Sequence, residues 1–162
     1  MLRRALVLAS AIVLAQPAIA HAQGTPPLEP ALRGLPAVKL MVVDLDASGT
    51  YPLDPELRRQ LERDLTRAGV PMSDTAGAVL KLTVSHRPTA DNSSAFYVYE
   101  LEVQEKVSIV RNPNAGVFLA RTWVDGGRGT ATKMGVERAL RDGTREATQK
   151  FLNELRQASA AR

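Results

Sequence analysis

The 162-residue sequence contains no cysteine. This absence excludes a disulfide framework, a thiol nucleophile, a metal site built on thiolates and a lipid anchor attached to cysteine. Aromatic residues are also scarce, at 4% of the chain. A protein of this composition must be held together by its apolar core, and about 140 residues are enough for one such core.

Histidine is almost absent, and this limits the catalytic chemistry that the chain can support. His21 lies in a predicted signal peptide, which leaves His86 beside Ser85. Neighbouring strand residues point to opposite faces, so these two side chains are badly placed as a nucleophile and its base. We therefore interpret His86 as a surface histidine at a strand end, and we predict no enzymatic activity, no cofactor and no metal site. An alternative left open is a small-ligand or lipid carrier, or less readily an enzyme; a small-ligand carrier or an enzyme would use His86 with Asp44 and Asp46.

The first 22 residues have the pattern of a secretory signal peptide. Arg3 and Arg4 precede an uncharged apolar segment over residues 5–15, and the small-residue pattern Ala20, His21, Ala22 follows. We predict cleavage after Ala22, with Ala20 as the second choice. The apolar segment is shorter than the roughly 18 to 20 residues of a membrane-spanning helix, so no integral membrane segment is expected in the mature chain. The predicted location is the periplasm, with secretion as the second choice.

The charge balance of the mature chain is close to neutral. The whole sequence has 21 basic and 17 acidic residues, and loss of Arg3 and Arg4 leaves 19 basic residues and a net charge of +2. A strongly basic surface is the usual footprint of nucleic-acid binding. We therefore predict no nucleic-acid partner.

Proline content and hydrophobic periodicity divide the chain into segments. We predict a flexible, proline-rich lead-in over residues 23–36, a single domain over residues 37–158 and a disordered tail over residues 159–162. Within the domain, a nearly continuous apolar run at residues 38–46 predicts a central strand covered on both faces. Alternating patterns predict further strands at residues 78–87 and in a long hairpin over residues 96–130, which turns at residues 112–116.

Two helices complete the predicted domain. Asp54 and Pro55 are a good N-cap and first helical residue, and Gly69 ends that helix with the pattern of a Schellman cap. A second helix is predicted over residues 133–158, with Gly143 on its inner stripe, where close approach to the sheet would compensate for weak helix propensity. The order strand, helix, three strands, helix predicts an α+β fold: a mostly antiparallel four-stranded sheet with two helices packed on one face. The position of the first strand in the sheet stays open.

Two motifs fail as ligand sites. Residues 44–49 have the spacing of the first half of a calcium loop, but the position of its bidentate glutamate is occupied by Pro55. The glycines at positions 126, 127 and 129 lie where a phosphate loop would, but Thr132 and Met134 break both nucleotide-binding patterns. We interpret these glycines as a flexible or positive-φ connection into the last helix.

The aromatic residues of the hairpin are the candidate binding residues. Tyr97, Tyr99 and Trp123 lie on its two arms, and together with Arg121 they are predicted to form a partner-binding patch. The alternative is that the aromatic rings only cover the core beneath the helices. On the first arm, the opposite parity is polar and is predicted to face water: Glu100, Glu102, Gln104 and Lys106. Exposed strand edges offer a second kind of docking site.

The layout of the chain resembles that of small bacterial envelope proteins. The residues that carry the resemblance are the segments Lys39-Leu-Met-Val-Val-Asp-Leu45, Leu65-Thr-Arg-Ala-Gly-Val70, Tyr97-Val-Tyr-Glu-Leu-Glu-Val103 and Ala120-Arg-Thr-Trp123. In order and hydrophobic pattern they are similar to the amino-terminal domain of TolB and to LptE-like lipoproteins. The chain lacks the lipidated cysteine of the latter and the β-propeller of the former. The resemblance implies a non-catalytic envelope module that works by contact with a partner protein.

Overall fold

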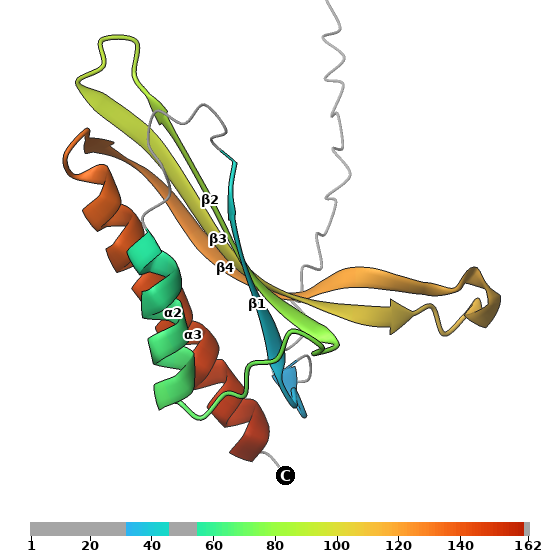
Figure 1. Ribbon diagram of the computed structural model, residues 1–162. Coiled ribbons are helices and arrows are strands. Elements are labelled where there is room, and N and C mark those ends of the chain that lie inside the picture. The colour runs from blue at the N-terminus through green and yellow to red at the C-terminus, as the bar shows by residue number, and fades with distance from the viewer. Residues whose placement is uncertain (1–31, 46–54, 161–162) are drawn as a thin grey trace, which may run out of the picture.

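The computed structural model describes residues 32–45 and 55–160, and these form an α+β domain (Figure 1). The described elements are β1 (Val38–Asp44), α2 (Pro55–Arg67), β2 (Ala78–Pro88), β3 (Ser94–Ser108), β4 (Val117–Thr132) and α3 (Val136–Ala160), with a 3₁₀ turn at Pro113–Ala115 between β3 and β4. The predicted α+β class, with one four-stranded sheet and two helices, is confirmed.

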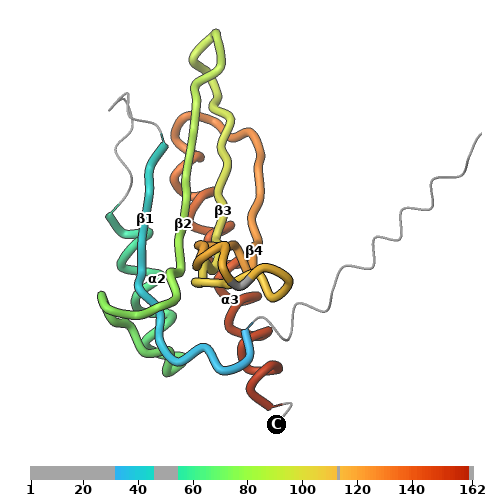
Figure 2. Tube along the Cα trace, turned by 90° about the vertical axis from the view of Figure 1, so that its right-hand side faces the viewer, coloured from blue at the N-terminus to red at the C-terminus, as the bar shows by residue number. Residues whose placement is uncertain are grey.

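The strands follow the order β1-β2-β3-β4, and Figure 2 shows them side by side in that order. β1 runs parallel to β2, whereas β2 with β3 and β3 with β4 are antiparallel. The sheet is therefore mixed, and the prediction of a mostly antiparallel sheet is wrong. The parallel pair arises because α2 lies between β1 and β2 in the sequence and acts as the crossover that parallel strands need.

The first strand also differs from its prediction. β1 lies at an edge of the sheet, and Met41 in its middle is 39% exposed. An apolar run does not by itself distinguish a central strand from an edge strand, because the backbone pairing that decides the position leaves no trace in hydropathy.

α2 is an amphipathic helix that ends as the sequence predicts. Leu57, Leu61 and Leu65 are buried along one face. Gly69 adopts a φ of 74°, and the Val70 amide donates to the Leu65 carbonyl at 3.0 Å. This hydrogen bond is the outer bond of a Schellman cap, which satisfies a free carbonyl at the helix end.

α3 packs on β3 and β4, and α2 packs chiefly against α3. Between the helices, Gln60 Nε2 donates to the Arg141 carbonyl at 3.4 Å. The predicted layer of two helices on one face of the sheet is therefore not clearly formed. The core joins residues of both helices with the buried positions of β2, β3 and β4, which include Leu80, Leu101 and Trp123.

The described domain extends beyond both of its predicted ends, residues 37 and 158. Leu32, within the predicted flexible lead-in, is fully buried in the core. At the other end, α3 continues to Ala160, and Ala158 is buried. No helix in the described part of the chain is both long enough and apolar enough to cross a membrane.

Candidate interaction surface

β3 and β4 extend well beyond the rest of the sheet. The pairing of β2 with β3 ends at Val79 opposite Gln104, whereas β3 and β4 stay paired as far as Ser108 opposite Val117. Residues 105–120 therefore form a two-stranded hairpin that is flanked by no other strand among the described residues, and we call this hairpin the arm. Figure 1 shows that the arm turns out of the sheet and projects away from α3.

A β-bulge lies where the arm begins. Val103 pairs with Trp123 and Gln104 pairs with Arg121, so Thr122 is an extra residue in β4. A bulge bends its strand and increases the local twist, which accounts for the change of direction. The Thr122 hydroxyl donates to Glu105 Oε2 at 2.8 Å, and this hydrogen bond holds the bulged residue in place.

A buried carboxylate fastens the base of the arm. Glu102 is 1% exposed. It accepts hydrogen bonds from Lys81 Nζ at 3.1 Å and Gln104 Nε2 at 2.7 Å, and its Oε2 forms an ion pair with Arg121 Nε at 2.6 Å. These groups come from β2, β3 and β4, so the cluster joins three strands at the bend. The prediction that Glu102 faces water is wrong, because its cationic neighbours and the bend of the hairpin enclose it.

The surface of the arm is apolar and basic. Val110 is 95% exposed, Val117 67%, Phe118 45% and Leu119 58%. Between residues 106 and 120 the sequence has Lys106 and Arg111 and no acidic residue. Exposed apolar residues are ordinary when they are scattered, but a contiguous group indicates a contact surface.

The four residues predicted to bind a partner do not form one surface. Trp123 is 1% exposed; its ring lies 5.3 Å from that of Phe151 in a T-shaped arrangement, and its Nε1 donates to Glu154 Oε2 at 2.6 Å. Tyr97 and Tyr99 are partly buried against the core on the same face of the sheet.

Arg121 lies on the opposite face, where it also forms an ion pair with Glu100 at 3.2 Å. Contact of these four residues with a partner stays a prediction. The apolar residues beyond the bulge were missed as a group because sequence periodicity does not show where a long hairpin leaves its sheet.

The glycine cluster of β4 leaves space for the rings of Tyr97 and Tyr99. Gly127 and Gly129 lie in β4 opposite Tyr99 and Tyr97, and a Cβ on either glycine would lie 2.6 Å from the hydroxyl of the facing ring. None of the three clustered glycines has a positive φ. The predicted flexible or positive-φ connection is therefore wrong, and these glycines make room for rings that lie across the strand.

The same ring explains the glycine in α3. A Cβ on Gly143 would lie 2.5 Å from Tyr99 Cζ, so the predicted close approach of this helix to the sheet is confirmed. Burial raises the pKa of the Tyr99 phenol, and the charges of Glu146 and Asp125 raise it further. Tyr99 is thus placed as a neutral packing residue.

The residues considered for catalysis are not brought together as a reactive group. His86 is 6% exposed and pairs with Tyr97, so its interpretation as a surface residue is wrong; β2 continues to Pro88 and keeps His86 inside the sheet. Ser85 is half-buried and lies on the other face. Asp44 lies opposite Val84, while Asp46 and the rest of the calcium-like loop lie outside the described residues. The residues that the structure describes contain no group of three or more side chains arranged to hold a metal ion.

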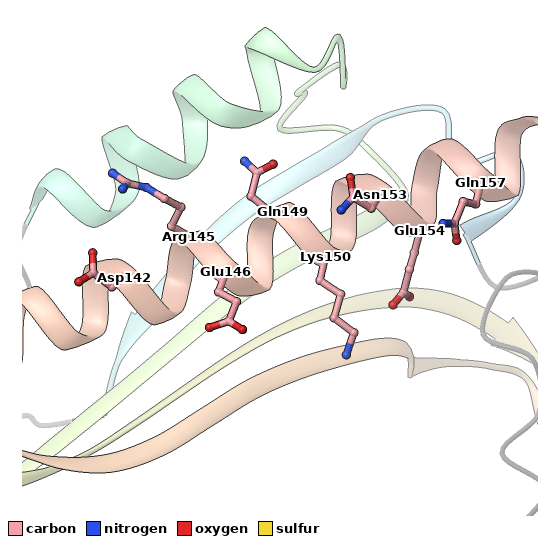
Figure 3. Close-up of a pocket in the computed structure, with 8 residues that line it drawn as sticks. All are labelled: Asp142, Arg145, Glu146, Gln149, Lys150, Asn153, Glu154 and Gln157. Atoms are coloured by element: carbon pink, nitrogen blue, oxygen red, sulfur yellow. The ribbon is translucent and has the colours of Figure 1, made fainter.

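A groove along α3 has a volume of about 700 Å³ (Figure 3). Its lining side chains diverge: Arg145 and Gln149 point toward α2, whereas Glu146, Lys150 and Glu154 point toward the strands. Lys150 Nζ donates to Asp125 Oδ1 at 2.8 Å, and this hydrogen bond raises the pKa of the lysine. Because these polar groups do not converge on one point and the groove is open and charged, it lacks the apolar, enclosed character of a small-molecule site.

The chain matches no model of a known protein family and no curated protein sequence. The candidate site therefore rests on the geometry of the arm and its base.

Proposed function

We propose that this protein is a non-catalytic binding or accessory module of the bacterial envelope, and that it acts through contact of its arm with a partner protein. One observation carries the proposal. The arm contributes no residue to the hydrophobic core, yet it exposes the apolar side chains of Val110 and of three consecutive residues, Val117, Phe118 and Leu119. Such a group costs solubility and gives the fold nothing, so a contact function accounts for it best.

The predicted signal peptide at residues 1–22 supports an envelope location, with the periplasm preferred over secretion. The resemblance to small envelope proteins favours the same compartment and the same non-catalytic role. The near-neutral mature chain favours a protein partner over nucleic acid. We propose that function lies in the arm, beyond the four residues that the sequence suggested.

Affinity capture tests this proposal. The tagged mature protein is recovered from mildly crosslinked envelopes, and the proteins recovered with it are identified by mass spectrometry. The test variant is Val117→Ser with Leu119→Ser, which removes two exposed apolar side chains of the arm. The matched control is Met134→Ser, because Met134 is 95% exposed but lies between β4 and α3.

We expect a specific set of envelope proteins with the unmodified chain and with the Met134 control, and loss of that set with the arm variant. Thermal unfolding of all three proteins shows whether the fold is intact. Recovery of the same proteins by the arm variant at the same yield contradicts the proposal. Trp123→Ala is not a suitable binding variant, because it removes a core side chain.

A further inference from the structure

β4 presents a free edge along the arm. It is an outer strand of the sheet, and its only strand partner within the described residues is β3. In an antiparallel pair, alternate residues direct their N–H and C=O groups away from the partner strand. The outer side of Val117, Phe118 and Leu119 is therefore open to pairing with another strand.

The side chains at this edge are exposed on both faces of the arm. Val117 and Leu119 point to one face and Phe118 to the other, and all three are at least 45% exposed. A strand added at this edge would place apolar side chains next to them on both faces. This is the arrangement by which extended peptides bind sheet edges: main-chain hydrogen bonds supply affinity, and alternate side chains supply specificity.

The charge of the arm restricts the kind of strand. Lys106 lies opposite Leu119, and Arg111 lies in the turn region. Neither forms an ion pair with a described residue. The one carboxylate of the arm is Glu105 at its base, which accepts a hydrogen bond from the Thr122 hydroxyl at 2.8 Å, so the arm has two basic residues and one acidic residue. A second copy of this chain would bring like charges together, whereas an acidic segment would be attracted.

The free edge also argues against insertion of the arm into a lipid bilayer. Basic and apolar residues together are a pattern that anionic membranes attract. Hydrocarbon, however, cannot satisfy the outward N–H and C=O groups of an edge strand, and open sheet edges do not occur in the hydrocarbon region. A protein strand satisfies these groups directly.

We infer that the arm binds its partner by strand addition at the β4 edge around residues 117–119, and that the partner segment is extended and combines apolar with acidic residues. This inference rests on the proposed function and names the chemistry of the partner. Lys106 and Arg111 attract the acidic side chains, while the apolar residues of β4 pack against the alternating apolar ones.

Site-specific crosslinking in cells tests the inference with the full chain. A photo-reactive amino acid replaces Leu119 in one strain and Met134 in a control strain, and peptide mass spectrometry maps the crosslinked position on the partner. The mapped segment is then synthesised, and amide hydrogen exchange of β4 is measured with and without it. We expect an apolar and acidic segment at Leu119 but not at Met134, and exchange of the β4 edge amides slowed about tenfold or more at saturation.

The charge requirement is tested with the same peptide. Lys106→Glu with Arg111→Glu should weaken its binding by about fivefold or more, while Arg58→Glu on the exposed face of α2 should leave it unchanged. Circular dichroism establishes that both variants are folded.

The outcomes separate the inference from the proposed function. If the crosslinked partner segment is helical or basic, strand addition by an acidic segment is overturned. The same holds if the synthesised peptide leaves amide exchange of β4 unchanged. In both cases the contact of the arm with a partner protein still stands. An adduct with a second copy of the chain or with lipid overturns the acidic partner segment and the contact with a different protein. Absence of any arm-specific adduct overturns both.

Discussion

Trp123 is a packing residue at the junction of β4 and α3. It contacts Phe151 edge to face, and its indole nitrogen donates to the Glu154 carboxylate. Hairpin periodicity shows that Trp123 shares a parity with its neighbours, but it does not show which face α3 covers. The strand pattern is therefore compatible with Trp123 as an exposed contact residue and with Trp123 as a core residue. The packing of α3 against this face of the sheet shows that it is a core residue.

Trp123→Ala should lower the free energy of unfolding by about 3 to 5 kcal/mol, because it removes a large buried ring and leaves a cavity against Phe151. Urea unfolding followed by circular dichroism measures the change. Val124→Ala is the matched control: Val124 is 38% exposed on the opposite face, and its loss should cost less than about 1 kcal/mol. Equal effects of the two substitutions would place Trp123 outside the core.

Gly143→Ala should destabilise the protein although alanine favours helices over glycine by about 1 kcal/mol. The added methyl group would overlap the Tyr99 ring, so the ring or the helix must move. Asn153→Ala, at an exposed position of the same helix, should be neutral or slightly stabilising. Thermal unfolding of the two variants gives the comparison, and a higher melting temperature for Gly143→Ala would show that α3 does not approach Tyr99 closely.

At the scale of elements, the sequence predicted most features that depend on residues close together in the chain. The Schellman cap of α2, the alternation of β2 and the turn before Gly116 depend on residues close in sequence, and the structure contains each of them. The predicted N-cap of α2, Asp54, lies outside the described residues. The edge position of β1 and the burial of Glu102 depend on contacts between distant strands. No hydropathy pattern encodes them, because Glu102 is stabilised by Lys81 and Arg121, each about 20 residues away.

The turn between β2 and β3 has its own electrostatic support, which gives a pH-dependent prediction. Hydrogen bonds from the Thr89 and Ser93 hydroxyls, and then from the Ser93 amide, lower the pKa of Asp91 from 3.8 to about 2. A carboxylate with a lowered folded-state pKa stabilises the fold above its unfolded pKa. The contribution of Asp91 should therefore be complete above about pH 4 and be lost as the pH falls through about 2.

Thr89→Ala should raise the pKa of Asp91 toward 3.8, because it removes the largest of these hydrogen bonds. An NMR titration of the Asp91 carboxyl carbon measures the value. Ser93→Ala removes the second hydroxyl and should shift the pKa in the same direction by a smaller amount. An unchanged Asp91 pKa in both variants would mean that the turn does not form these hydrogen bonds in solution.

At the scale of the whole molecule, the protein divides into a packed body and an arm with different roles. All residues of the core cluster lie outside residues 104–122. The sequence predicted the hairpin and its turn, but it did not predict that the hairpin leaves the sheet. That departure depends on one extra residue, Thr122, and on the end of β2 pairing at Gln104. A single bulge leaves a period-two pattern nearly intact, so it is invisible without the pairing register.

The division predicts that the arm can be removed without loss of the fold. Glu105 and Ala120 are direct partners in the β3 and β4 register, so an Asn-Gly turn in place of residues 106–119 should close the shortened hairpin. Because no core residue is lost and the Glu102 cluster stays complete, the free energy of unfolding should stay within about 1 kcal/mol of the full chain. Urea unfolding measures it, while envelope capture should lose every arm-dependent partner. A shortened chain that unfolds far more readily would make the arm part of the folding unit, whereas a stable one that keeps its partners would move the contact surface to the body.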